Sequence, residues 1–397
     1  MQRIFLGARP DWLQKAEAAG FAFHSMHGEP YWDEESAYAF TLEEIEGGIE
    51  DPSTELHRMC REAAAEITGS EELMTRLAIP PEHMDLVRNS WTAGEPELYG
   101  RMDLAFGAGG PAKLLEYNAD TPTSLFETAS FQWSWLEDRI ADGALPEGSD
   151  QFNGVFEALR DRLGALFESG TDLHFAAFEA SPEDYATVET MAYAAREAGL
   201  GAHFVDMGAI ALSTEGQFLD GESRVIGALF KLYPWEDMLR DEFADAIAGA
   251  RCRMLEPAWK AVISNKGLLP VLWRLFEGHP NLLPAFFGDE LEAGGAAVER
   301  ARDTLSRGQV RKPIFSREGA GVVISEGGAV TEASSNHAYD AHPTIVQAYH
   351  PLPVMDGMRP VIGAWIVGDR CVGMGIREDR SRITEDFSRF KPHYIEP

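Results

Sequence analysis

Hydrophobic residues recur at helical spacing in the first part of the chain. The clearest run is TELHRMCREAAAEITGSEELMTRLAI, residues 54–79, within an acidic stretch, 30–80, that is helical in pattern. A second helix is expected over 124–140, SLFETASFQWSWLEDRI, where aromatic and aliphatic residues keep the same period. Ser124 and Glu127 have the spacing of a capping box at its start.

Two short strands lie between these helices, and an α/β unit follows. The segments RMDLAF, 101–106, and AKLLEYN, 112–118, flank the glycine-rich turn GAGGP. Residues 173–207 then have the pattern strand, loop, helix, turn, strand. The middle of the chain is therefore expected to contain a layer of helices packed on strands.

The pattern changes near residue 250. Residues 256–276, EPAWKAVISNKGLLPVLWRLF, are apolar enough for a buried helical segment. The segments that follow, 312–328, 343–353 and 360–379, are β-branched and are joined by Gly and Pro turns. We therefore expect the last third to be mostly antiparallel sheet, and the whole chain to have an α/β (α+β) fold.

The composition argues against several classes of partner. The 397 residues include 34 basic and 65 acidic side chains, which gives a formal charge of -31. This balance disfavours binding to nucleic acid or to an anionic membrane, so any anionic ligand must be held by a few concentrated cations. No run approaches the roughly 18 apolar residues of a membrane span, and the start has no secretion signal. Three scattered cysteines, Cys60, Cys252 and Cys371, fit reduced thiols, so a cytoplasmic location is expected.

The two short strands collect charged side chains on one face. In the expected antiparallel hairpin, the pairs are Phe106 with Lys113, Asp103 with Glu116 and Arg101 with Asn118. Two ionised carboxylates so close together share either a proton or a cation. Together with an amide oxygen they suit Mg²⁺, and a guanidinium beside them suits a phosphate. A lone Glu-x-Asn pair is usually a solvated strand face, but this combination favours a metal site.

The loop ADTPTS, 119–124, follows the second strand and leads into a helix start. Its hydroxyl groups and the free N–H groups of a helix N-terminus form an anion site. We therefore expect Thr121, Thr123 and Ser124 to bind a substrate carboxylate beside the metal.

Lysines are scarce, yet Lys266 and Lys312 lie inside apolar stretches. A buried ammonium group needs a partner, which is either a phosphate or a structural carboxylate, and the sequence leaves both open. The turn SREGAG, 316–321, can bring backbone N–H groups onto a phosphate, although most glycine-rich turns are only turns.

Three further features belong to the same part of the chain. Residues 347–349, QAY, can present backbone N–H and C=O groups to a purine. Arg377 ends a glycine-punctuated strand and can reach into a cleft, although a surface ion pair with Glu378 or Asp379 is the plainer interpretation. His24 and His27 are interpreted as structural, and the chain contains no Walker A loop and no dinucleotide-binding glycine motif.

Six ordered motifs resemble the glutathionylspermidine synthase family, the ATP-grasp module that forms amide bonds. They are GRMD, LLEYNADTPTS, EPAWK…SNKGLLPVLW, KPIFSREGAG, QAYHPLPVMDG and GMGIRED, and they span nearly the whole chain. The resemblance implies one ATP-grasp module over 1–397, with nucleotide sandwiched between β-containing lobes in a permuted order. The implied regions are a helical region with the metal-binding hairpin, 1–140, an α/β lobe, 150–250, and the ATP-grasp lobes, 251–397.

The resemblance also implies roles for residues. Two Mg²⁺ ions would be held by Asp103, Glu116 and Asn118. ATP would be bound by Arg101, Lys266, Lys312, Ser316, Arg317, Glu318, Gly319, Ala320, Gly321, Gln347, Ala348 and Tyr349. Arg377 and Arg101 would act in catalysis: Arg377 would stabilise the acyl phosphate and the tetrahedral species that follows, and Arg101 would contact the phosphates. The substrate would contact Thr121, Thr123, Ser124, Glu183 and Asp184.

The expected reaction is ATP- and Mg²⁺-dependent joining of a peptide-like or small carboxylate to an amine through an acyl phosphate. Nothing in the chain resembles the amidase domain fused to some family members, so the stand-alone form is expected, and both glutathione and a polyamine remain open as substrates. Two alternatives also remain: a nucleotide-binding protein of this fold without turnover, and a metal-dependent ATP phosphohydrolase. The oligomeric state is not predicted.

Overall fold

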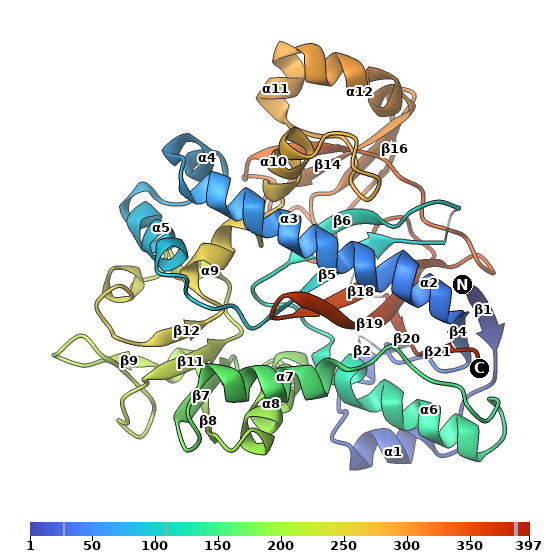
Figure 1. Cartoon of the computed structure of the whole chain (residues 1–397), viewed down its shortest axis with the longest axis horizontal. Helices are drawn as coiled ribbons and strands as arrows, with labels where there is room; N and C mark the ends of the chain where they lie inside the picture. Colours follow the sequence, from blue (N-terminus) through green and yellow to red (C-terminus); the bar gives the residue numbers. More distant parts are fainter. Residues whose placement is uncertain (27, 108, 385–387) are drawn as a thin grey trace.

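A five-stranded antiparallel sheet forms the centre of the molecule in the computed structural model, which describes residues 1–26, 28–107, 109–384 and 388–397 (Figure 1). Its strand order is β20-β19-β18-β5-β6. The strands are β5 (Tyr99–Ala105), β6 (Lys113–Asn118), β18 (Arg359–Val367), β19 (Arg370–Asp379) and β20 (Arg389–Lys391). The long strands β18 and β19 are buried over most of their length because α3 (Asp51–Thr68) and α7 (Val155–Leu166) pack against them. Two segments far apart in the sequence, 99–118 and 359–391, thus share one sheet.

A second antiparallel sheet lies beside the central one, in the upper part of Figure 1. Its order is β13-β17-β14-β15-β16. The strands are β13 (Ala285–Phe287), β14 (Gly308–Pro313), β15 (Val323–Glu326), β16 (Ala329–Ala333) and β17 (Thr344–Ala348). The helices of this part are α10 (Leu268–Leu275), α11 (Gly288–Ala293) and α12 (Ala296–Arg307). The expectation of antiparallel sheet in the last third is therefore confirmed.

A parallel sheet with the order β12-β11-β7-β8 forms the third layer. Its strands are β7 (Asp172–Ala177), β8 (Gly201–Asp206), β11 (Ala228–Lys231) and β12 (Arg253–Leu255). β7 and β8 are joined by α8 (Pro182–Glu197), which begins at the N-cap Ser181 and packs on both strands. The α/β unit expected over 173–207 is confirmed.

The two ends of the chain meet in a small sheet with the order β1-β4-β21 (Figure 1). Its strands are β1 (Gln2–Phe5), β4 (Ser36–Phe40) and β21 (His393–Ile395). The prediction of helix across 30–80 missed β4, whose five residues are all buried and so show no alternation of polar and apolar positions. His24 makes edge-on contacts with aromatic rings of this region. His27 lies outside the described residues.

The remaining elements are short and mostly connect the sheets. The helices are α1 (Trp12–Ala18), α2 (Leu42–Ile45), α4 (Glu71–Arg76), α5 (Met84–Thr92), α6 (Gln132–Ala141) and α9 (Trp235–Met238). The strands are β2 (Ser25–Met26), β3 (Glu29–Pro30), β9 (Ala211–Leu212) and β10 (Phe218–Leu219). Among the described residues, no helix has both the length and the hydropathy needed to cross a bilayer.

The helix expected over 124–140 forms, but it starts differently. It contains a π-helical turn, Glu127–Phe131, before α6. The expected capping box is absent because Ser124 and Glu127 both turn to the Tyr31 hydroxyl, which donates to the Glu127 carboxyl group. Ser124 itself has a φ of 70°, which L-residues rarely adopt. This strained residue connects the loop after β6 to the helix.

Candidate active site

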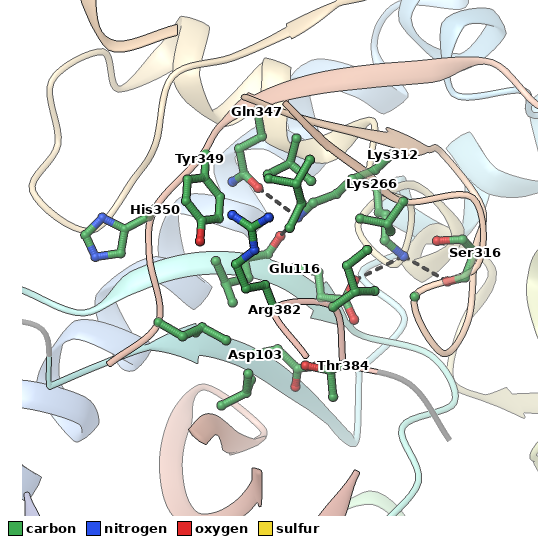
Figure 2. Close-up of a pocket in the computed structure, with 18 of the residues that line it drawn as sticks. Asp103, Glu116, Lys266, Lys312, Ser316, Gln347, Tyr349, His350, Arg382 and Thr384 are labelled. Atoms are coloured by element: carbon green, nitrogen blue, oxygen red, sulfur yellow. Dashed lines mark hydrogen bonds and ion pairs between the residues drawn. The ribbon is translucent and has the colours of Figure 1, made fainter. Parts of the chain in front are cut away.

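The β5–β6 hairpin has the predicted pairing at its charged end. Arg101 lies opposite Asn118, and Asp103 lies opposite Glu116. A bulge after Asp103 then shifts the register, so Lys113 pairs with Ala105 and not with Phe106 as predicted. Asp103 and Glu116 line the same cavity, so their side chains lie on one face of the sheet (Figure 2).

Asp103 is held by two arginines. Its carboxylate accepts hydrogen bonds from Arg101 Nε at 2.8 Å and from Arg377 Nη2 at 2.5 Å. Arg101 is buried and also donates to the Thr123 carbonyl at 2.7 Å, so it lies behind Asp103 and outside the cavity lining. Arg377 does line the cavity. The alternative of a surface ion pair with Glu378 or Asp379 is wrong, because Arg377 pairs with Asp103, while Glu378 pairs with Arg3 and Lys391.

Glu116 faces a lysine from the other side of the cavity. Lys266 Nζ lies 3.1 Å from the Glu116 carboxylate and donates to the Ser316 carbonyl at 2.8 Å. Asn118 Nδ2 donates to Glu116 at 3.2 Å. Burial alone would raise the pKa of Glu116, but Lys266 and Lys312 outweigh it and hold the pKa well below its usual value. The carboxylate is therefore ionised, as a metal ligand must be.

Lys312 is a buried cation with no carboxylate within ion-pairing distance in the described structure. Its ammonium group donates to the Leu115 carbonyl at 2.9 Å and to Gln347 Oε1 at 2.8 Å. Burial lowers its pKa to about 8, against the opposing effect of Glu116. Figure 2 shows Lys266 and Lys312 on the same side of Glu116. An anion entering here would give Lys312 the charged partner that it lacks among the described residues.

The turn 316–321 joins β14 to β15 at the edge of this cavity. Ser316, Glu318 and Gly319 line the cavity, and the buried Ser316 hydroxyl has no hydrogen-bond partner among the described residues. Gly321 has a φ of 69°, and a Cβ atom there would lie 2.7 Å from Pro313. The turn is therefore shaped by glycine and leaves a polar atom for a ligand.

The segment 347–349 also lines the cavity, but two of its backbone N–H groups already make hydrogen bonds within the protein. The N–H groups of Ala348 and Tyr349 donate to the carbonyls of Pro284 and Gly308. A purine would therefore meet side chains and carbonyl groups here more readily than these two N–H groups. The adjoining wall is apolar and consists of Val310, Val322, Ile324, Leu352, Val361 and Ile383.

The residues Arg382, Ile383 and Thr384 line the cavity and were missed by the sequence reasoning. Arg382 bridges the sheets, because it follows β19 and ion-pairs at 2.6 Å with both Glu326 and Glu332 of the β15–β16 region. In sequence these residues belong to the charged segment EDRSRITED, which has the pattern of a solvated turn.

The loop after β6 is fixed by a buried ion pair. Asp120 accepts from Lys231 Nζ at 2.6 Å and from the Trp235 N–H at 2.8 Å, and both charged side chains are fully buried. Arg317 Nη2 donates to the Thr121 hydroxyl at 3.3 Å, which joins this loop to the turn 316–321. The loop itself is not part of the cavity lining.

Glu183 is a half-buried acid beside the same loop. Burial raises its pKa, and a hydrogen bond from Thr123 opposes that effect. Asp184 is next to it in the first turn of α8. Of the predicted substrate residues, the structure thus brings Glu183 to Thr123, while Ser124 turns to Tyr31.

The donor set at the hairpin has the chemistry that Mg²⁺ requires. It consists of two carboxylates and an amide, all oxygen donors. Within the described residues, no group of three or more His, Cys, Asp or Glu side chains is arranged to hold a metal.

Comparison with known proteins identifies the family. The sequence pattern of the glutathionylspermidine synthase preATP-grasp family matches residues 3–396. A Haemophilus influenzae protein, provisionally named an acid--amine ligase, is 39% identical and aligns over 98% of both chains. The chain therefore belongs to the glutathionylspermidine synthase family, which makes it an acid–amine ligase.

Longer relatives match over part of their length. A trypanothione synthetase of Crithidia fasciculata is 30% identical over 83% of this chain and 52% of its own. The bifunctional glutathionylspermidine synthetase/amidase of Escherichia coli is 24% identical over 96% of this chain and 63% of its own. The solved structure of a glutathione synthetase-like effector from Globodera pallida has a TM-score of 0.58 at 11% identity, covering 98% of each chain. The chain therefore shares its mixed α/β architecture with this solved structure.

Proposed function

We propose that this ligase uses ATP and Mg²⁺ to activate a carboxylate as an acyl phosphate, which an amine then attacks to form an amide. The observation that carries this proposal is one cavity, between two antiparallel sheets, lined by paired carboxylates on one side and by Lys266 and Lys312 on the other. In such a cavity a triphosphate is bound between cations from the protein and a divalent ion.

The nucleotide would lie along this cavity as in an ATP-grasp fold. Lys266, Lys312 and the orphaned Ser316 hydroxyl supply hydrogen-bond donors for phosphate oxygens. The apolar wall that includes Val310 and Ile383 offers a slot for a purine ring. We infer that Arg382, which joins the two sheets over the cavity, closes this slot on one side.

Asp103, Glu116 and Asn118 would hold one or two Mg²⁺ ions. When bound there, Mg²⁺ supplies charge neutralisation for the phosphate oxygens. The chain's own contribution is to hold the two carboxylates adjacent. Arg101 and Arg377 fix Asp103 by ion pairs, and Lys266 pairs with Glu116.

The acid substrate would lie between the cavity and the loop 119–124. Thr121, Thr123 and Arg317 supply donors for its carboxylate groups, and Glu183 and Asp184 supply acceptors for its N–H or ammonium groups. The substrate carboxylate attacks the γ-phosphoryl group in line, and ADP is the leaving group. The amine nitrogen then attacks the acyl carbon, and phosphate leaves. Arg377 stabilises the negative charge that develops on the tetrahedral species.

The names of the relatives suggest the substrates. We propose a glutathione-like peptide as the acid and a polyamine-like molecule as the amine, because the related enzymes are named for glutathionylspermidine and trypanothione. The charge of -31 is consistent with steering of a cationic amine.

The test is an assay of ADP release with ATP, Mg²⁺ and a panel of peptides and amines, with products identified by mass spectrometry. ADP release that requires both an acid and an amine, with a matching amide mass, is the expected result. ADP release without any amine would instead indicate a phosphohydrolase, and nucleotide binding with no ADP under any combination would indicate a binding protein without turnover.

A further inference from the structure

A second hollow lies beside the second antiparallel sheet, where α10, α12 and the end of β17 meet. It is an open groove of about 670 Å³, in the upper part of the molecule in Figure 1. Among the described residues it shares only Tyr349 and His350 with the cavity proposed for the nucleotide. The Tyr349 N–H donates to the Gly308 carbonyl at 2.9 Å, and a Cβ atom at Gly308 would lie 3.0 Å from the Tyr349 Cβ atom. This closely packed main chain separates the groove from the cavity.

Two cations that line the groove have no carboxylate partner. Lys113, at the start of β6, donates to the Pro280 carbonyl. Arg307, at the end of α12, donates to the Thr304 hydroxyl at 3.4 Å. Neither cation makes an ion pair with a described residue. In a chain with 65 acidic and 34 basic side chains, two such cations in one groove indicate that an anion from outside the chain binds there.

The acidic side chain in the described lining of the groove is already neutralised. Glu326 pairs with Arg382 at 2.6 Å and accepts a hydrogen bond from the Thr331 hydroxyl at 2.9 Å. His279 also lines the groove, and it pairs at 3.5 Å with Glu55, which lies outside the lining. The groove is therefore locally cationic, opposite in sign to the chain as a whole.

Two more polar side chains of the groove lack partners within the described part of the chain. The Trp273 indole N–H, on α10, is buried and has no hydrogen-bond acceptor. A buried donor without an acceptor is rare in proteins and is commonly completed by a ligand or water. The His350 side chain, beside Tyr349 in Figure 2, has no described hydrogen-bond or ion-pair partner. Burial and the charge of Lys113 lower the pKa of His350, so these two side chains share one partly desolvated corner.

We propose that this groove is a second anion site, separate from the nucleotide cavity, and that it binds a small organic monophosphate. The dianion of a phosphate monoester matches the two unpaired cations, Lys113 and Arg307, whereas a monocarboxylate would leave one of them uncompensated. The Trp273 N–H supplies a further donor. The rest of the wall is apolar and suits an apolar substituent on the phosphate; it includes Pro280, Leu282, Leu283, Pro284 and Pro351.

The charge of the whole chain limits the size of the ligand. A formal charge of -31 repels a long polyanion, so the groove suits a small anion and not a nucleic acid. The cations assigned to ATP, Lys266 and Lys312, do not line the groove. Binding in the groove requires neither nucleotide nor turnover, so this proposal and the proposed function fail separately.

The experiment is isothermal titration calorimetry with phenyl phosphate as the probe, on the full chain without nucleotide. The test variant is Lys113→Gln/Arg307→Gln. The matched control is Arg274→Gln/Arg302→Gln, which removes two exposed cations of α10 and α12 from outside the lining. Lys312→Met removes a cation from the nucleotide cavity and so detects any binding of the probe there. Circular dichroism confirms that each variant is folded.

We expect a phenyl phosphate site that survives in Lys312→Met, and whose Kd rises about tenfold or more in Lys113→Gln/Arg307→Gln, because two charge-assisted hydrogen bonds are lost. The control should change Kd by less than about twofold, because it alters only the general field. Trp273→Phe keeps an aromatic ring but removes the N–H group, and it should raise Kd about threefold.

Four results would overturn the proposal. Loss of binding in Lys312→Met, with none in the groove variant, would place the probe in the nucleotide cavity. Equal weakening by the groove and control variants would mean that general charge, and not the groove, attracts the probe. Benzoate bound as tightly as phenyl phosphate would show that the groove does not select a phosphate. Inorganic phosphate bound as tightly would show that the apolar wall takes no part.

Discussion

Arg377 offers a direct test of the proposed chemistry. Its guanidinium is 23% exposed, lines the cavity and holds Asp103 at 2.5 Å. In Arg377→Ala, Asp103 keeps its hydrogen bond from Arg101 at 2.8 Å, so the carboxylate is not left unpaired. The cost in stability should therefore be only about 1 kcal/mol.

The effect on turnover should be much larger. If Arg377 faces the charge that develops during transfer, its removal should lower kcat by about 10²–10³, or about 2.7–4 kcal/mol. The Kd for ATP should rise by less than about threefold, because Lys266 and Lys312 remain to bind phosphate.

The assay measures amine-dependent ADP release at saturating substrates, with ATP affinity measured separately by calorimetry. Arg370→Ala is the matched control, because Arg370 is an exposed arginine at the opposite end of β19. Arg377→Lys should recover part of the rate. Equal losses in kcat and in ATP affinity would refute the assignment and make Arg377 a binding residue.

Three other variants have distinct expected outcomes. Glu116→Gln should raise the Mg²⁺ concentration for half-maximal activity about 10–100-fold without unfolding the protein, because a neutral amide is a weaker ligand. Glu127→Gln should stabilise the protein at pH 9 by on the order of 3 kcal/mol and have little effect at pH 4.5, as followed by denaturant unfolding at each pH. Lys231→Met should lower the free energy of unfolding by about 3–5 kcal/mol, because it leaves Asp120 buried without its cation.

The sign of the Glu127 effect follows from its pKa. Burial, with the charge of Glu183, raises that pKa from its ordinary value of 4.5 to about 8. The folded chain therefore holds this proton between those two values while the unfolded chain releases it, so stability falls as pH rises through this window. A Glu127→Gln variant with the same pH dependence as the wild type would contradict this explanation.

Specific results would also contradict the predictions for Glu116→Gln and Lys231→Met. An unchanged Mg²⁺ requirement in Glu116→Gln would remove Glu116 from the metal site. If Lys231→Met lowers the free energy of unfolding by less than about 1 kcal/mol, solvent must reach Asp120. Lys15→Met is its control, because that lysine is 38% exposed.

The sequence was sufficient for the charged end of the hairpin and insufficient for the rest of the hairpin and its surroundings. Charged residues at alternate positions predicted that Asp103 faces Glu116. The bulge was not predictable, because the contacts around it come from distant residues. Lys312 donates a hydrogen bond to the Leu115 carbonyl, and Gln347 donates one to the Leu114 carbonyl.

The contacts of the cationic side chains around the cavity were not predictable from the sequence either. For Lys266 the sequence left phosphate and carboxylate open, and the structure supplies Glu116 at 3.1 Å. The buried Arg101 side chain donates a hydrogen bond to the Thr123 carbonyl, and only the tertiary fold places these two groups together. Arg382 reaches the cavity only because β19 and the β15–β16 region belong to adjacent sheets. Such contacts depend on tertiary packing, which local patterns do not encode.

The central claim is that ATP and a divalent cation bind between the two antiparallel sheets at the β5–β6 hairpin. The most direct measurement is a crystal structure with a non-hydrolysable ATP analogue and Mn²⁺, with the ion located by its anomalous signal. The account predicts Mn²⁺ between the carboxylates of Asp103 and Glu116, and phosphate oxygens at Lys266 and Lys312. Nucleotide bound elsewhere, with no anomalous peak at the hairpin, would contradict it.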